Sequence, residues 1–184
     1  MQGIIIKSIF SIFIGFLFPL IGGAQVTPPD SVQVVVNDSI AKRDTVPKNS
    51  KQVDEIISFA KKFLGTPYHY AGTTPSGFDC SGFIYYVMGN FGFSLTRTSY
   101  GLAEFGRTVK ISELRPGDLM FFKGRNVNST QIGHVAMVVE VSPGVIKFIH
   151  SSTSRGVVID NFLTSKYYIP RFIKAKRLDY GVEE

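Results

Sequence analysis

The chain has a single cysteine, Cys80, no tryptophan, and charged side chains at only 18% of its 184 positions. A lone cysteine excludes an intrachain disulfide framework and any zinc or iron–sulfur site that needs several thiolates. Low charge combined with 44% hydrophobic residues excludes a wholly disordered chain. The 18 glycines and 9 prolines follow no fixed period, so collagen-like and solenoid architectures are also excluded. The length allows one ordinary domain with extensions.

Lysine and arginine number 20 against 14 aspartate and glutamate residues, which gives a formal net charge of +6. The basic residues are scattered, and no basic run is interleaved with aromatics, so we expect no nucleic-acid partner. A weak attraction to anionic envelope polymers fits this balance better, although net charge governs encounter and solubility rather than activity. We expect the folded unit to be a monomer.

Residues 1–24 have the order of a secretory signal. Lys7 precedes an apolar run over residues 8–21, and a small-residue Gly-Gly-Ala segment ends at Ala24. The alternative is a retained membrane anchor, but the run is short for a bilayer span of roughly 20 residues, and Pro19 interrupts it. We therefore expect cleavage after Ala24 and export to the periplasm, cell envelope or extracellular space. No stable membrane span is expected after cleavage.

Residues 25–50 are rich in Pro, Asp, Ser and Asn and balance positive against negative side chains, which is typical of a flexible linker. The folded unit is then predicted over residues 51–184. A chain of that length can bury roughly two thirds of its extended surface, which is enough for one core.

The folded unit begins with helical patterns and continues with strand patterns. An amphipathic helix is predicted over 53–64, and a second helix over 80–90 with Asp79 as its N-cap. The intervening residues 65–78 are rich in Gly, Pro and Thr and predict a shaped loop. Helices followed by antiparallel strands indicate an α+β domain. The predicted strands cover residues 118–122, 134–141, 145–150, 157–160 and 171–177.

Two histidines are predicted to meet across one hairpin. If Ser142-Pro143-Gly144 forms the turn, His134 faces His150, and Val138 faces Ile146 on the same side of the strand pair. A register slip of one residue would place the two imidazoles on opposite faces. Both faces of this hairpin are otherwise apolar, so we expect it to be covered on both sides.

Cys80 opens the second predicted helix, where unpaired N–H groups and the helix dipole favour a thiolate. The same N–H groups can hold the oxyanion that forms when a thiolate attacks an acyl carbon. Cys80 and the two histidines therefore provide a nucleophile, a base and an orienting group. Two alternatives remain: Cys80 is a small buried hydrophobe, or the histidines bind a metal. A metal site would lack the usual carboxylate or further imidazole.

Several motifs occur in a characteristic order: LGTPYHYAG, PSGFDCSGF, TRTS, LRPGDLMFF, GHVAMVVE and FIHSS. In these motifs the sequence resembles the NlpC-type cell-wall cysteine peptidases of the papain-like clan, over about residues 53–178. The resemblance implies a papain-like NlpC-type α+β domain in which N-terminal helices pack on a central antiparallel β-sheet. Three positions depart from the usual pattern: Ala71 replaces the first Gly of a pair, Tyr70 a frequent Trp, and Leu102 a common Gln.

The resemblance also implies roles for individual residues. Cys80 falls on the family's nucleophile, His134 on its general base, and His150 on the polar residue that orients the base. Substrate-binding positions fall on Tyr68, Asp79 and Ser81. No metal or other cofactor is implied.

The implied function is that of a secreted endopeptidase that hydrolyses peptidoglycan stem peptides, at the bond between γ-D-glutamate and a diamino acid, through a thioester. Alternatives on the same triad are an amidase at the sugar–peptide junction or an acyltransferase. A non-catalytic wall-binding domain and a metallohydrolase that uses His69 with the two other histidines are further alternatives. No separate targeting segment fits in residues 51–184, so recognition is expected to come from the cleft itself.

Overall fold

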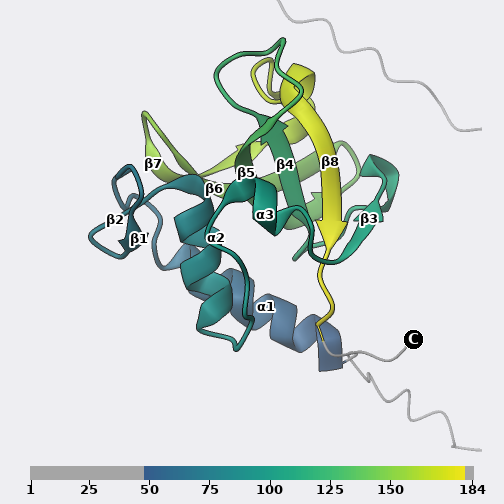
Figure 1. Ribbon diagram of the computed structural model, residues 1–184. Coiled ribbons are helices and arrows are strands. Elements are labelled where there is room, and N and C mark those ends of the chain that lie inside the picture. The colour runs from purple at the N-terminus through teal and green to yellow at the C-terminus, as the bar shows by residue number, and fades with distance from the viewer. Residues whose placement is uncertain (1–47, 181–184) are drawn as a thin grey trace, which may run out of the picture. The chain divides into compact units, whose positions relative to one another are not determined.

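The computed structural model describes residues 48–180, with side chains from residue 51 onward; the predicted signal and most of the predicted linker lie outside this range. Within the described part, no helix is long and apolar enough to cross a membrane. Figure 1 shows the elements. They are α1 (Lys48–Lys61), β1 (Thr73–Thr74), β2 (Gly77–Phe78), α2 (Cys80–Gly89), α3 (Ser99–Leu102), β3 (Arg107–Val109), β4 (Leu119–Lys123), β5 (Ile132–Ser142), β6 (Val145–Ser152), β7 (Gly156–Asn161) and β8 (Phe172–Arg177), with short 3-10 helices at Ile111–Glu113, Phe162–Thr164 and Ile169–Arg171.

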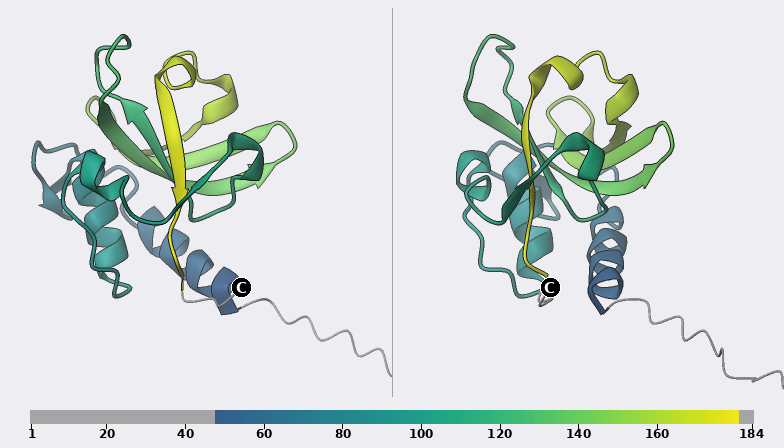
Figure 2. Two further views of the ribbon diagram at one scale, coloured as in Figure 1. Left: turned by 45° about the vertical axis from the view of Figure 1, so that its right-hand side comes forward. Right: turned by 90° about the vertical axis from the view of Figure 1, so that its right-hand side faces the viewer.

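Six strands form one antiparallel sheet in the order β3-β8-β4-β5-β6-β7. Helices α1 and α2 lie against one face of this sheet, as Figures 1 and 2 show from three directions. The predicted α+β fold, with helices packed on a central antiparallel sheet, is therefore confirmed. Strand β3 and the small β1–β2 hairpin were not predicted, because runs of two or three residues carry no readable alternation.

The two main helices begin and end for local reasons. Helix α1 begins at Lys48, three residues inside the segment predicted as a linker, and ends before Gly65, whose φ of +84° suits a residue without Cβ. Helix α2 begins as predicted. The Asp79 carboxylate accepts a hydrogen bond from the Gly82 N–H at 2.7 Å and caps the helix start.

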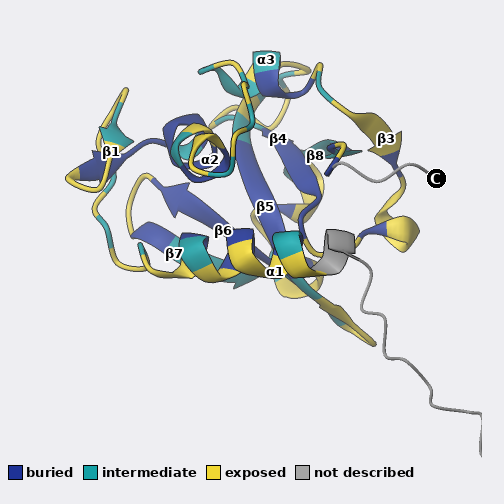
Figure 3. Cartoon of the chain, turned by 90° about the horizontal axis from the view of Figure 1, so that it is seen from below, coloured by how far each residue is buried: buried dark blue, intermediate teal, exposed yellow. Residues whose placement is uncertain are grey.

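The sheet is covered on both faces, as the apolar hairpin predicted. One core cluster joins Ile56 of α1 and Phe83 of α2 to one side of β4, β5 and β6. A second cluster on the opposite side contains Phe122, Phe148 and Tyr168, the last contributed by the segment between β7 and β8. Figure 3 shows the sheet residues under the two helices as buried. Each such large side chain contributes about 1.5–3 kcal/mol when fully buried.

The hairpin register differs from the prediction. Met137 pairs with Ile149 and Val138 with Phe148, so the pairing is displaced by two residues and the predicted Val138–Ile146 pair is wrong. The turn is also tighter, because Ser142 already pairs with Val145, and a register irregularity between Val138 and Glu140 absorbs the difference. At Met137 and Val138 the displacement is two, which keeps the side chains on their predicted faces, whereas from Glu140 to Ser142 it is three. His134 and His150 are therefore on one face, as predicted, but are not directly opposite each other.

An ion pair closes the end of the sheet near the chain's C-terminus. Arg177 donates from Nε and Nη2 to the two carboxylate oxygens of Asp118, both at 2.7 Å, and Asp118 is only 1% exposed. The Tyr180 hydroxyl donates to the Gly117 carbonyl at 2.6 Å. The PGDL motif therefore fastens β8 and the following residues to the start of β4.

Candidate active site

Cys80 is the first residue of α2 and remains partly exposed, while its side chain packs against the helix-side core. The backbone N–H groups of Val135, of Ser81 and of Cys80 itself favour negative charge on its sulfur. Val135 directly follows His134 in β5, so Cys80 lies against the strand that carries His134. The fold thus places the start of α2 beside a strand more than 50 positions later in the sequence.

The two predicted histidines are in contact. His134 Nε2 lies 3.1 Å from His150 Nδ1, and the two rings are nearly perpendicular, at 88°. The other nitrogen of His150, Nε2, lies 3.0 Å from the Asp160 carboxylate. Three side chains therefore form one hydrogen-bonded row, from Asp160 through His150 to His134.

This row specifies where the protons lie. A carboxylate only accepts hydrogen bonds, so His150 carries its proton on Nε2 and presents a bare Nδ1 to His134. His134 must then donate from Nε2, which leaves its own Nδ1 bare. The bare Nδ1 is the free proton acceptor of the histidine pair. The carboxylate thus fixes the imidazole orientation that a general base requires.

Asp160 is a member of the row that the sequence reasoning missed. Arg155 donates to both of its carboxylate oxygens, at 3.0 and 2.5 Å. Hydrogen bonds from His150 and Arg155 hold the pKa of Asp160 well below its usual range, despite partial burial, so the carboxylate is ionised. His150 pairs with Val158 across β6 and β7, so Asp160, two residues further, is its diagonal neighbour on the same face. The alternation of side chains along β7 indicates which of its residues share a face. It identifies Asp160 as a neighbour of His150 only once the pairing of β6 with β7 is known.

Tyr168 was also missed, because it comes from a segment without regular structure. Its ring stacks on His134 at 26° and 5.8 Å between centroids, and its hydroxyl lies 3.5 Å from His150 Nδ1. Burial raises the pKa of Tyr168 far above its usual value, so the hydroxyl stays neutral. Tyr168 thus packs against the two histidines on the face of the sheet opposite the helices.

Burial sets the charge state of the catalytic candidates. It raises the pKa of the Cys80 thiol, with a smaller contribution from Asp79, and this outweighs the backbone N–H groups. Burial also lowers the pKa of His134 to about 3 and lowers that of His150. Burial therefore opposes the thiolate that the start of the helix favours, and it disfavours a positive charge on His134 as well.

Asp79 and Ser81, predicted to bind substrate, are both buried. Arg97 donates to the Asp79 carboxylate at 2.7 Å and to the Ser81 hydroxyl at 2.9 Å, which joins the TRTS and FDCSG motifs. Gly82 allows the backbone of Gly72 to pack closely against this part of α2, because a Cβ on Gly82 would lie 2.0 Å from the Gly72 carbonyl oxygen. The structure therefore gives these residues a supporting role at the start of α2, and their contact with substrate stays a prediction.

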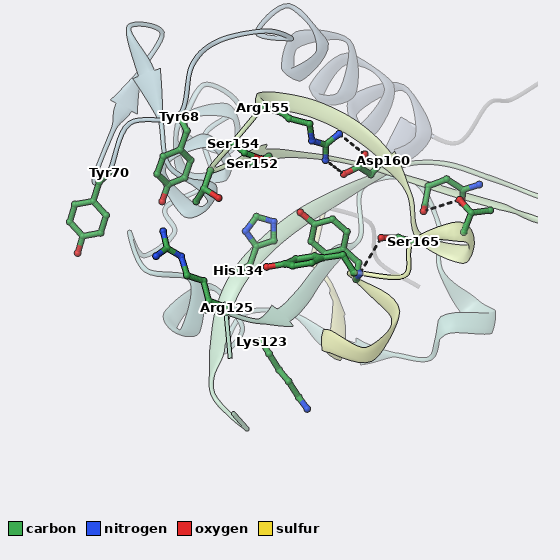
Figure 4. Close-up of a pocket in the computed structure, with 17 residues that line it drawn as sticks. Tyr68, Tyr70, Lys123, Arg125, His134, Ser152, Ser154, Arg155, Asp160 and Ser165 are labelled. Atoms are coloured by element: carbon green, nitrogen blue, oxygen red, sulfur yellow. Dashed lines mark hydrogen bonds and ion pairs between the residues drawn. The ribbon is translucent and has the colours of Figure 1, made fainter. Parts of the chain in front are cut away.

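Tyr68 lines an open cavity of about 780 Å³ that also contains His134 and Asp160. Figure 4 shows Tyr68 on one side of His134, and Arg155 paired with Asp160 on the other. The pKa of Tyr68 is raised, first by burial and then by Cys80 and Asp79, so Tyr68 lies near both the cavity and the nucleophile. Cys80 does not line the cavity, whereas His134 does.

His69, the third histidine of the metal alternative, is exposed, and its Nδ1 lies 3.1 Å from the Tyr70 carbonyl oxygen. Among the side chains of residues 51–180, no three histidine, cysteine or acidic groups are arranged to hold a metal ion. The imidazoles of His134 and His150 instead contact each other, and His150 also contacts the Asp160 carboxylate.

The profile of the NlpC/P60 family matches residues 65–177. The chain is 35% identical over 148 residues to a gamma-DL-glutamyl hydrolase of Bacillus subtilis, covering 80% of this chain and 33% of that protein. It is 35% identical over 140 residues to a probable endopeptidase NlpC of Escherichia coli, covering 72% of this chain and 86% of that protein. A crystal structure of an NlpC/P60 family protein from Bacillus cereus superposes with a TM-score of 0.60 at 36% identity, covering 68% of this chain and 39% of that one.

The chain therefore belongs to the NlpC/P60 family. The chain spans only about a third of the length of the Bacillus subtilis hydrolase. Membership of the family therefore does not assign that whole protein's activity to this chain.

Proposed function

We propose that this protein is an exported cysteine endopeptidase that hydrolyses peptidoglycan stem peptides. The observation that carries the proposal is the Asp160–His150–His134 row, which leaves a bare ring nitrogen beside the strand position that contacts Cys80. Relatives named as a glutamyl hydrolase and an endopeptidase support the reaction class. The predicted leader over residues 1–24 would place the enzyme in the periplasm, cell envelope or extracellular space.

In the first half-reaction, His134 Nδ1 takes the thiol proton while the Cys80 sulfur forms a bond to the scissile carbonyl carbon. The oxyanion is held by backbone N–H groups at the start of α2, where the helix dipole is positive. The tetrahedral adduct collapses as the C–N bond breaks, and the imidazolium of His134 gives its proton to the leaving amine. A thioester on Cys80 remains.

In the second half-reaction, water attacks the thioester and His134 takes the water proton. The C–S bond then breaks, and the imidazolium returns a proton to the sulfur, which regenerates the starting state. His150 stays in place throughout and is held by Asp160 so that His134 keeps its useful tautomer. The ionised carboxylate also stabilises the transient positive charge on the row, as in other triads.

The bond proposed is the one between γ-D-glutamate and the diamino acid. Tyr68 would contact the part of the substrate nearest the nucleophile, and Asp79 and Ser81 would support the position of its amino end. The substrate enters from the cavity on which Tyr68 and His134 both lie.

The test is digestion of purified muropeptides with mass identification of the products, by wild-type protein and by the Cys80→Ala and Cys80→Ser variants. We expect cleavage at the γ-D-glutamyl bond by wild type only, with loss of at least about 10⁴-fold in the variants because the covalent step is removed. A product cut at the sugar–peptide junction would indicate an amidase, and a transferred acyl group would indicate a transferase. Full activity of a folded Cys80→Ala protein would reject the mechanism.

A further inference from the structure

The cavity beside His134 has an uneven distribution of charge. Three cationic side chains line it, from Lys123, Arg125 and Arg155, against the single carboxylate of Asp160. That carboxylate is already engaged by the two guanidinium nitrogens of Arg155 and by His150. Arg155 and Asp160 therefore neutralise each other, and two positive charges on the cavity wall have no counterpart there.

Lys123 and Arg125 differ in direction. The Lys123 ammonium donates to the Val127 carbonyl at 2.9 Å, and Figure 4 shows its side chain pointing away from His134. The Arg125 guanidinium instead extends toward Tyr68 and Tyr70 (Figure 4). Its charge acts on Tyr68, where it opposes the rise in the hydroxyl pKa. Within residues 51–180, no carboxylate lies within ion-pair distance of Arg125.

The backbone that carries Arg125 is held in place. Gly124 and Gly133 approach each other across the base of the β4–β5 loop so closely that a Cβ on Gly133 would lie 2.7 Å from the Gly124 Cα. Arg171 donates from Nη2 to the Arg125 carbonyl at 3.3 Å, and its own guanidinium lies 3.8 Å from the centroid of the Tyr167 ring. The loop base is therefore positioned by packing, and the Arg125 side chain starts from a defined point next to His134.

An unpaired guanidinium beside a tyrosine hydroxyl suits one ligand chemistry above others, a planar carboxylate bound through two parallel N–H···O bonds. We propose that Arg125 binds a free carboxylate of the substrate and makes the enzyme select peptides that carry it. This inference rests on the proposed function. Besides the C-terminal carboxylate that every stem peptide has, the residues on either side of the scissile bond offer two sources of that group: the α-carboxylate of the γ-linked glutamate and the side-chain carboxylate of a diaminopimelate residue.

Four synthetic peptides separate these sources. The reference is L-Ala-γ-D-Glu-diaminopimelate with all carboxylates free; in the others, the glutamate α-carboxylate is amidated, the diaminopimelate side-chain carboxylate is amidated, or lysine replaces the diaminopimelate. We expect wild-type kcat/KM to fall roughly 10- to 100-fold when the recognised carboxylate is removed, as for loss of a charge-assisted hydrogen bond. Lysine and amidated diaminopimelate should behave alike if the diamino acid supplies the group.

The matched variants are Arg125→Gln, Arg125→Lys and Lys123→Gln. Arg125→Gln should lower kcat/KM for the free-carboxylate peptide to the level of its amidated counterpart and leave the amidated peptide unchanged. Arg125→Lys should recover part of the preference, because it keeps the charge but loses the fork geometry. Lys123→Gln should keep the preference, since that side chain points away. A preference that survives Arg125→Gln, or no preference in wild type, overturns the proposal.

Binding to the Cys80→Ala protein, measured by calorimetry with the same peptides, separates this proposal from the proposed function. If wild type cleaves none of the peptides but the Cys80→Ala protein binds the free-carboxylate form at least 10-fold more tightly than the amidated form, and Arg125→Gln removes the difference, the carboxylate site stands without the hydrolase. If neither form is preferred in binding, the carboxylate site is rejected, whether or not cleavage occurs.

Discussion

At the residue scale, the ring nitrogens that carry the protons decide whether the histidine pair can act as a base. Two neutral imidazoles in contact have two ways to arrange their protons, and only one leaves His134 Nδ1 bare. The 3.0 Å contact between His150 Nε2 and the ionised Asp160 selects that arrangement. Asp160 thus acts through His150 and is a positioning residue.

Replacing Asp160 with Asn tests this role. An amide both donates and accepts, so it no longer forces the proton onto His150 Nε2. We expect imidazole ¹⁵N NMR to show His150 and His134 shifting toward the opposite tautomers, which is resolvable because the chain has only three histidines. We expect kcat to fall by about 10-fold or more, within the 10²–10⁴-fold that general acid–base catalysis contributes, with little change in KM.

The control is Arg155→Gln, which removes one of the two partners of Asp160 and keeps both the carboxylate and its contact with His150. It should preserve the tautomers and most of kcat. Wild-type tautomers in a folded Asp160→Asn protein would show that the carboxylate does not orient the row.

A second residue-scale feature is backbone strain at Ala71, the one non-glycine residue with positive φ (59°) among the described residues. Left-handed backbone costs an L-residue with a Cβ roughly 1 kcal/mol. The departure from the family's usual glycine is thus a local cost in stability. We expect Ala71→Gly to raise the free energy of unfolding by about 0.5–1 kcal/mol in urea titrations.

The matched control is Gly65→Ala, which adds a Cβ at φ +84° in open space and should destabilise by a similar amount. An unchanged or lowered stability of Ala71→Gly would mean that the added freedom of the unfolded chain outweighs the relief.

At the element scale, side-chain periodicity and strand pairing contributed differently to the prediction of the site. The hairpin placed His134 and His150 on one face although its predicted register was displaced by two, because face assignment depends only on parity. Asp160 required the pairing of β6 with β7, and Tyr168 required an irregular segment folded over the sheet, and neither is encoded in local periodicity. The position of Cys80 at the start of α2 was predictable, since Asp79 caps that helix through a local hydrogen bond.

A second feature at the element scale is the PGDL segment, which does not line the cavity. Asp118 is buried, accepts two hydrogen bonds from Arg177, and accepts a third from the Arg115 N–H at 2.8 Å. Removing one partner of a buried pair leaves the other charge uncompensated. We expect Asp118→Asn to lower the free energy of unfolding by about 2–4 kcal/mol.

Measuring kcat tests whether Asp118 stabilises the sheet or takes part in the reaction. Assayed well below its melting temperature, Asp118→Asn should keep kcat near the wild-type value, and Glu140→Gln, which breaks an exposed pair with Lys147, should change stability by less than about 1 kcal/mol. A large loss of kcat in folded Asp118→Asn would assign the motif to the chemistry instead.

At the scale of the whole molecule, the histidine pair, with His150 buried and His134 partly exposed, makes stability depend on pH. The folded-state pKa of His134 is lowered to about 3, whereas the unfolded value is about 6.5. Between these values the unfolded chain binds more protons than the folded protein, so stability falls as the pH drops from 6.5 toward 3. Asp160 acts in a lower window: its lowered pKa contributes stability above about pH 4, and this is lost on further acidification.

We therefore expect the free energy of unfolding to decrease by roughly 2 kcal/mol between pH 6.5 and pH 4.5 because of His134 alone, a range in which Asp160 contributes little. His134→Gln removes one of the two titrating imidazoles and should make this part of the profile shallower in urea titrations at a series of pH values, leaving the contribution of His150. His69→Gln, at an exposed site, should leave the profile as in wild type. A His134→Gln protein whose stability declines as steeply as wild type would show that the imidazole does not resist protonation in the fold. The neutral resting pair on which the proton transfer from Cys80 depends would then have to be replaced by a preformed thiolate–imidazolium pair.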